Sequence, residues 1–187
     1  MSRLATLACA GVLLLTGCAS DVEGDATGTE PAASAAESTS TAGADSTASE
    51  ASVDVPEVLD FTTETVAGEP FDGADLAGRP TVFWFWAPWC PTCRAQISGV
   101  GELAATYGSE VNVVGIGALD EREAIEEFAA EVSPDVTLLA DPEGAAWRHF
   151  GVTAQSTYLV LDESGTELES GYLDDAELVA LVDDLVG

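Results

Sequence analysis

Two cysteines separated by two residues form the most reactive group in this 187-residue chain. Cys90 and Cys93 stand in Cys90-Pro91-Thr92-Cys93, shortly after the apolar run 81–86. The β-branched and aromatic residues of this run predict a strand covered on both faces, and Pro91 is favoured in the first turn of a helix. Cys90 is therefore expected at a helix N-terminus, where unpaired amides and the helix dipole favour a thiolate. We predict a dithiol/disulfide couple in which Cys90 is the exposed, activated sulfur.

Other chemistries use the same cysteine spacing. A structural zinc site needs four ligands, and the region after residue 55 offers these two cysteines and the single histidine, His149. Ala87 stands where the thiol peroxidase pattern has threonine. We therefore predict no metal, no cofactor beyond the redox-active disulfide, and an ordinary polar role for His149. A structural disulfide in a non-catalytic binding or adaptor lipoprotein remains the alternative.

The N-terminus has the pattern of an export signal. Arg3 precedes an apolar run, 4–15, that is too short to span a bilayer. The run ends in Leu15-Thr16-Gly17-Cys18, which resembles the bacterial lipobox. We predict a lipoprotein signal peptide at residues 1–17 and a lipidated Cys18 that anchors the protein to the outer face of the cell membrane. An ordinary signal peptide cut elsewhere is the alternative.

Composition divides the rest of the chain. Residues 18–55 are rich in Ala, Ser, Thr and acidic residues and contain no aromatic residue, which predicts a disordered tether. Residues 56–187 are long enough for one domain with a sizeable core. If the signal peptide is removed and Cys18 is acylated, only Cys90 and Cys93 remain as free thiols, in a compartment where disulfides persist.

Apolar periodicity predicts alternating strands and helices in this domain. Strands are expected at 57–61, 65–71, 81–86, 111–117, 136–140, 157–161 and 166–172. Helices are expected at 91–107, 121–132 and 143–150, and from Asp174 to the C-terminus. The first two strands form a hairpin. This order predicts an α/β fold, with a central mixed sheet, helices on both faces and an N-terminal β-hairpin.

Residues 61–187 resemble the thioredoxin-like TlpA and Dsb proteins of bacterial envelopes, above all the exported actinobacterial DsbE and DsbF type. The resemblance rests on residues 84–93, 114–117 and 150–153. It implies a thioredoxin-like fold and thiol-disulfide exchange with cysteine-containing envelope or secreted proteins, with Cys90 as the attacking or attacked sulfur and Cys93 as the resolving one. The active-site environment that it implies comprises Trp84, Trp86, Pro88, Trp89, Pro91, Thr92, Arg94, Gln155 and Ser156.

The resemblance also implies a membrane redox partner, of the DsbB/VKOR-like or the DsbD/CcdA-like kind. The subgroup favours an oxidase, and a reductase for cytochrome c maturation is the alternative. Three positions depart from the family: Trp84 replaces a buried acidic or amide residue, Gln96 a glutamate, and Ser156 a cis-proline. A cis bond before a non-proline residue costs about 2.5–4 kcal/mol. We therefore predict a trans Gln155-Ser156 bond, with the Ser156 hydroxyl and N–H near the Cys90 sulfur.

The chain carries 34 acidic and 5 basic residues, a net charge of −29. This balance argues against nucleic acid as a partner and against attraction to anionic lipid. Residues 76–101 nevertheless contain no Asp or Glu and include Arg79 and Arg94. We predict a locally positive region that supports a thiolate at Cys90.

Overall fold

The computed structural model describes residues 55–187. The predicted signal peptide at residues 1–17, the lipidated Cys18 and the tether up to residue 54 lie outside the described residues, so this division of the chain stays a prediction. Within residues 55–187, no helix is long and apolar enough to cross a membrane.

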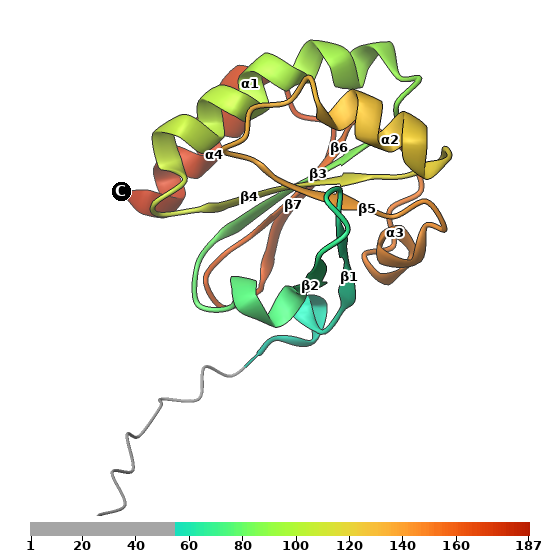
Figure 1. Cartoon of the computed structure of the whole chain (residues 1–187). Coiled ribbons are helices and arrows are strands. Elements are labelled where there is room, and N and C mark those ends of the chain that lie inside the picture. The colour runs from blue at the N-terminus through green and yellow to red at the C-terminus, as the bar shows by residue number, and fades with distance from the viewer. Residues whose placement is uncertain (1–54) are drawn as a thin grey trace, which may run out of the picture. The chain divides into compact units, whose positions relative to one another are not determined.

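A seven-stranded mixed sheet forms the centre of the described domain (Figure 1). The strands are β1 (Thr62–Thr65), β2 (Pro70–Asp72), β3 (Thr81–Trp86), β4 (Asn112–Gly117), β5 (Thr137–Ala140), β6 (Thr157–Leu161) and β7 (Glu167–Gly171). Their order across the sheet is β2-β1-β5-β4-β3-β6-β7. β3, β4 and β5 run parallel to one another, and the other pairings are antiparallel. The predicted mixed sheet with an N-terminal hairpin is confirmed.

Helices cover both faces of this sheet, as predicted. They are α1 (Pro91–Tyr107), α2 (Arg122–Ala129), α3 (Ala145–His149) and α4 (Asp175–Val186), with two 3-10 helices, η1 (Glu57–Leu59) and η2 (Gly73–Leu76). Residues of α1, α2 and α4 share one apolar core, and α3 and the two 3-10 helices contribute to the other. Figure 1 shows α1 and α4 side by side above the sheet and α3 on the side where β1 and β2 lie.

The predicted strand at 57–61 is wrong. Pro56, with φ −62°, leads directly into η1, and the Leu59 N–H bonds to the Pro56 carbonyl. Leu59 and Phe61 both enter the core, so their spacing of two imitates strand alternation. The predicted strand at 65–71 is also wrong, because it spans the hairpin turn itself, where Gly68 has a φ of 81°. Glycine adopts this value without strain.

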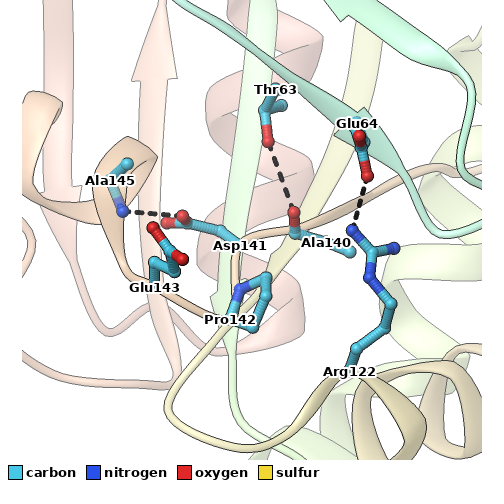
Figure 2. A pocket seen from close by; sticks show the side chains of 8 residues that line it. All are labelled: Thr63, Glu64, Arg122, Ala140, Asp141, Pro142, Glu143 and Ala145. Atoms are coloured by element: carbon cyan, nitrogen blue, oxygen red, sulfur yellow. Dashed lines mark hydrogen bonds and ion pairs between the residues drawn. The ribbon is translucent and has the colours of Figure 1, made fainter. Parts of the chain in front are cut away.

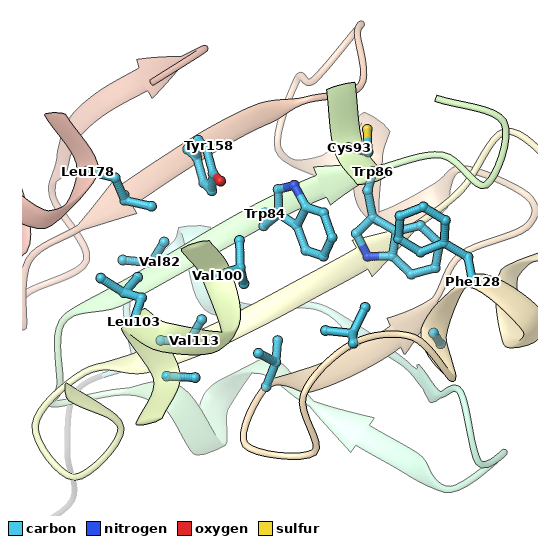
Figure 3. Close-up of a cluster of buried hydrophobic side chains, with 14 of the residues drawn as sticks. Val82, Trp84, Trp86, Cys93, Val100, Leu103, Val113, Phe128, Tyr158 and Leu178 are labelled. Carbon is cyan, nitrogen blue, oxygen red and sulfur yellow. The ribbon is translucent and has the colours of Figure 1, made fainter. Parts of the chain in front are cut away.

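β3 lies at the centre of the domain, and each of its side chains is buried. Its two tryptophans, Trp84 and Trp86, point to the core under α1 (Figure 3), and its two phenylalanines point to the other core. Trp84 pairs with Gly115 and Trp86 with Gly117 on β4. A Cβ atom at Gly117 would lie 2.5 Å from the Trp86 ring. The glycines of β4 therefore make room for the two indoles beneath the cysteines.

Candidate dithiol active site

Cys90 is the N-cap of α1, as predicted. After β3, the Cys90 N–H donates to the Ala87 carbonyl at 3.1 Å, and this turn brings the chain to the helix. The Cys90 Sγ accepts the Cys93 N–H at 3.2 Å. The sulfur therefore takes the place that a serine or aspartate oxygen has in an ordinary N-cap. Amide donors and the helix dipole at this position favour negative charge on the sulfur.

Both cysteines are free thiols, and both are buried. Cys90 is 2% exposed and Cys93 0%. The prediction of an exposed Cys90 is therefore wrong. The segment before β6 reaches over the dithiol, and its Ser156 oxygen lies 3.2 Å from the Cys90 Sγ. Cys90 nevertheless keeps a small exposed fraction, which Cys93 lacks.

The two thiols have opposite tendencies to ionise. Burial works against ionisation of Cys90, but hydrogen bonds from Cys93, from Ser156 and from the backbone of Thr92 and Cys93 outweigh it and hold the pKa of Cys90 below its ordinary value. Burial, followed by the hydrogen bond to Cys90, raises the pKa of Cys93 to about 11. One sulfur is thus prepared to carry negative charge and the other to keep its proton.

Ser156 lies between the two sulfurs. Its hydroxyl oxygen is 3.2 Å from Cys90 Sγ and 3.2 Å from Cys93 Sγ. The described residues contain no cis peptide bond, so the predicted trans Gln155-Ser156 bond is confirmed. The predicted contact of the Ser156 N–H with the sulfur is wrong, because this N–H donates to the Phe85 carbonyl at 2.8 Å. Only the hydroxyl faces the dithiol.

Gln96 connects this serine to the buried strand. Its Oε1 accepts the Trp84 indole N–H at 2.9 Å, and its Nε2 lies 3.5 Å from the Ser156 carbonyl oxygen as donor. All three residues are buried. The sequence marks Trp84, Gln96 and Ser156 as separate departures from a family pattern, and the structure joins them in one hydrogen-bonded chain. The sequence signal for this hydrogen bond is the combination of an indole in the buried strand, Trp84, with an amide one helical turn after the second cysteine, Gln96.

The prediction that a positive region around the cysteines supports the Cys90 thiolate is wrong. Arg94 pairs with Glu131 of the α2–β5 segment at 2.5 Å, donates to the Pro88 carbonyl at 3.3 Å and lies 4.9 Å from the centre of the Phe128 ring. Arg79 hydrogen-bonds to Asn112 at the opposite end of β3. The sequence segment lacks acidic residues, but a carboxylate from elsewhere in the chain reaches it. Hydrogen bonds, rather than arginine charge, therefore favour the thiolate.

The other predicted residues lie close to the cysteines in the chain or beneath them. The Trp86 ring stacks on Phe128 with centroids 4.3 Å apart, and Figure 3 shows this stack on the side of the sheet where Cys93 lies. Trp89 is 54% exposed, and its indole N–H donates to the Leu119 carbonyl at 3.2 Å. Pro88 is buried, Pro91 and Thr92 are exposed, and Gln155 is half-buried.

A cleft of about 160 Å³ opens beside the first turns of α1. It is lined by Thr92, Ala95, Gln96, Tyr172, Leu173, Asp174 and Asp175. Sequence reasoning missed Tyr172 and its neighbours, because they come from the segment between β7 and α4. Tyr172 is 63% exposed at this edge. The cleft therefore reaches the buried Gln96 from outside.

Figure 2 shows a second pocket, beside the pairing of β1 with β5. The side chains of Asp141, Arg122 and Glu64 already have partners. The Asp141 carboxylate accepts the N–H groups of Ala145 and Trp147 at 2.6 and 2.9 Å, and Arg122 pairs with Glu64 at 2.6 Å. These contacts begin α3 and join α2 to β1. These contacts therefore have a structural role in this part of the domain.

His149 is the last residue of α3 and is exposed, beside the core on the other side of the sheet from the cysteines. Its Nε2 is 3.0 Å from the Val58 carbonyl oxygen, and its ring centre is 5.6 Å from that of Phe61. It thus packs as an ordinary polar residue. Among residues 55–187, no three His, Cys, Asp or Glu side chains are grouped closely enough to hold a metal ion.

The fold and the paired cysteines define a thioredoxin-like dithiol protein. The profile of the Redoxin family matches residues 50–184, and the chain belongs to this family. The soluble secreted antigen MPT53 of Mycobacterium tuberculosis is 37% identical over 110 residues, which cover 59% of this chain and 63% of the antigen. The chain thus matches less than two thirds of the length of this curated relative.

Two solved structures from Mycobacterium tuberculosis are similar. DsbF has a TM-score of 0.66 and 40% identity, and the match covers 71% of this chain and 99% of DsbF. A secreted disulfide oxidoreductase that is homologous to DsbE of E. coli has a TM-score of 0.63 and 34% identity, covering 69% and 98% of the two chains. The predicted thioredoxin-like Dsb resemblance is confirmed.

Proposed function

We propose that this chain is an extracytoplasmic thiol-disulfide oxidoreductase that exchanges disulfides with cysteine-containing envelope or secreted proteins. One observation carries the proposal. Cys90, with a lowered pKa, and Cys93, with a pKa of about 11, share a single hydroxyl at the N-terminus of α1. This asymmetry makes Cys90 the sulfur that attacks or is attacked and Cys93 the resolving sulfur. The disulfide oxidoreductase among the similar structures supports the same chemistry.

The geometry favours the oxidising direction. A substrate thiolate attacks Cys90 Sγ, the Cys90–Cys93 bond breaks, and Cys93 leaves and takes up a proton. A second substrate thiolate then attacks the mixed disulfide and releases the Cys90 thiolate. Thiols of low pKa leave faster, so the lowered pKa of Cys90 assists this second step. The substrate dithiol becomes a disulfide and the protein becomes a dithiol.

The alternative is an adaptor protein with a structural disulfide. Equilibration with glutathione redox buffers, followed by counting of free thiols, separates the two. A catalytic couple exchanges within the range of glutathione, whereas structural disulfides have potentials below about −300 mV and resist reduction. A protein that stays fully oxidised across the range would support the adaptor. A Cys90→Ser variant is the control, because it has no internal disulfide to exchange.

The place of the protein in the cell belongs to the same proposal. We propose that lipidated Cys18 holds the domain at the outer face of the membrane. There a DsbB/VKOR-like protein would reoxidise the dithiol, or, in the reductive alternative, a DsbD/CcdA-like protein would reduce the disulfide. Export is supported by the secreted antigen and the secreted oxidoreductase among the relatives. Release of a Cys18→Ala variant from the membrane fraction would support the anchor, and an unchanged membrane fraction would contradict it.

A further inference from the structure

One hydroxyl group serves both sulfurs. The Ser156 Oγ lies 3.2 Å from Cys90 Sγ and 3.2 Å from Cys93 Sγ. A hydroxyl has one hydrogen to donate and two lone pairs to accept. It can therefore donate to one sulfur while it accepts the proton of the other, and exchange these roles when the charge moves.

Among the described residues, no ionisable side chain around the dithiol competes with Ser156 for hydrogen bonding to the two sulfurs. Arg94 is paired with Glu131, and Asp174 and Asp175 line the cleft beside Gln96. Tyr158 lies on β6, and its buried hydroxyl has no hydrogen-bond partner among the described residues. None of these groups hydrogen-bonds to either sulfur in the described domain. The amide of Gln96 and the indole of Trp84 are neutral and do not exchange protons readily at neutral pH.

We propose that the Ser156 hydroxyl is a catalytic proton relay between the Cys93 sulfur and the substrate sulfur bonded to Cys90. The inference rests on the proposed exchange reaction and holds for either direction of it. A disulfide bond places the substrate sulfur about 2 Å from Cys90 Sγ, the atom that the same hydroxyl contacts.

The resolving step balances as follows. The Cys93 thiol gives its proton to the Ser156 oxygen and attacks Cys90 Sγ. The Cys90–Cys93 bond forms, the bond from Cys90 to the substrate sulfur breaks, and that sulfur receives the hydroxyl proton. The products are the internal disulfide, a neutral substrate thiol and an unchanged serine. Burial, the largest cause of the raised pKa of Cys93, keeps this thiol protonated near neutral pH, and this is the reason that a relay is needed.

The backbone holds the serine in place for this role. Ser156 has a φ of 64°, a left-handed value that is unfavourable for a residue with a side chain. Its N–H is held by the Phe85 carbonyl at 2.8 Å, and its own carbonyl accepts from Gln96. The hydroxyl is thus the one hydrogen-bonding group of this residue that is directed at the dithiol. Gln96 is a positioning residue for it.

The test follows release of a thiol from a mixed disulfide at Cys90. The parent, Ser156→Ala and Ser156→Gly proteins are loaded with a cysteine peptide or with an aromatic thiol of low pKa, and release by Cys93 is timed between about pH 6 and pH 9, below the pKa of Cys93. Alanine removes only the hydroxyl, whereas glycine also removes the unfavourable φ. Tyr158→Phe is the matched control for loss of a buried hydroxyl.

For the peptide, which must leave as a neutral thiol, we expect a nearly pH-independent rate in the parent and in Tyr158→Phe. Both Ser156 variants should be slower by about tenfold or more at pH 7. Their rates should rise about tenfold per pH unit, because only the Cys93 thiolate then attacks. The aromatic thiol leaves as an anion and takes no proton, so its release should rise with pH in all four proteins.

Two results would overturn the relay. One is a steep pH dependence of peptide release in the parent, and the other is a flat dependence in Ser156→Ala. A variant that has lost its fold would release both thiols abnormally, so abnormal release of the aromatic thiol identifies a misfolded protein. If Ser156→Ala is misfolded, the pH dependence of peptide release in Ser156→Gly tests the relay instead. Failure of Cys90 to form any mixed disulfide would contradict the proposed function itself, whereas formation with equal pH profiles would contradict only the relay.

Discussion

The Trp84 indole donates its hydrogen to Oε1 of Gln96 at 2.9 Å in a fully buried position. The same amide reaches the Ser156 carbonyl with its other end. A continuous neutral connection therefore runs from β3 through α1 to the residue that contacts both sulfurs. A carboxylate in either position would make this connection sensitive to pH, and the amide and indole avoid that.

We predict that Gln96→Leu lowers the free energy of unfolding by about 1–3 kcal/mol, because it leaves the buried Trp84 N–H without an acceptor. Trp84→Phe removes the donor and fills most of the same space. Urea unfolding of both single variants and of the double variant measures the coupling. We expect the double variant to be less destabilised than the sum of the two. Simple additivity would show that the hydrogen bond contributes little.

Cys93→Ser should accumulate mixed disulfides with envelope or secreted proteins, whereas Cys90→Ser should not. Cys90 has the lowered pKa and keeps a small exposed fraction, and Cys93 is fully buried with a raised pKa. Loss of the resolving sulfur therefore leaves the first covalent product intact. Non-reducing gel electrophoresis after alkylation of free thiols detects these products. Equal trapping by the two variants would contradict the assignment of roles.

The reduced protein should lose stability as the pH rises from about 9 to 11. The pKa of Cys93 is raised from 9.0 to about 11 in the folded state. The folded state thus holds this proton more tightly, and the resulting stability is present below pH 9 and lost as the pH passes through the folded pKa. Such a shift corresponds to at most about 2.7 kcal/mol.

The oxidised protein supplies the control, because a disulfide does not titrate. Burial, followed by the charges of Asp175 and Tyr172, raises the pKa of Tyr158 in both redox forms, and the charge of Cys93 adds to this only in the reduced form. The difference between reduced and oxidised protein in denaturant unfolding across this pH range therefore isolates the cysteines. A parallel decline in the two forms would show that Cys93 ionises in the folded protein as easily as in the unfolded one.

Local patterns in the sequence were sufficient to predict the helix and strands that position the dithiol. The bounds of β3, α1 and β6 agree with the predictions, since each depends on neighbouring residues alone: a buried apolar run, a proline-started helix, and a second buried run. Contacts between distant segments could not be predicted in this way. Glu131 neutralises Arg94 from 37 residues away, and the Ser156 N–H turns to Phe85 instead of the sulfur. Both depend on where the sheet places segments that are remote in sequence.

The unusual backbone of Ser156 makes proline at this position a sharp test of how the redox couple is tuned. Proline cannot adopt the φ of 64° found here, and it lacks both the N–H that bonds to Phe85 and the hydroxyl that contacts the sulfurs. Ser156→Pro should therefore rearrange this segment and leave the reduced dithiol with fewer donors. Ser156→Ala keeps the N–H and loses only the hydroxyl, so it separates the two effects.

We predict that both variants are less oxidising than the parent. The Ser156 hydroxyl stabilises the Cys90 thiolate and hence the reduced form, and a stabilised reduced form makes the couple a stronger oxidant. A hydrogen bond to a charged group contributes about 1.5–3 kcal/mol, which corresponds to a potential about 30–60 mV more negative in Ser156→Ala. Equilibration with glutathione measures this shift for each variant beside the parent. A variant that is equally oxidising, or more so, would show that the hydroxyl does not set the potential.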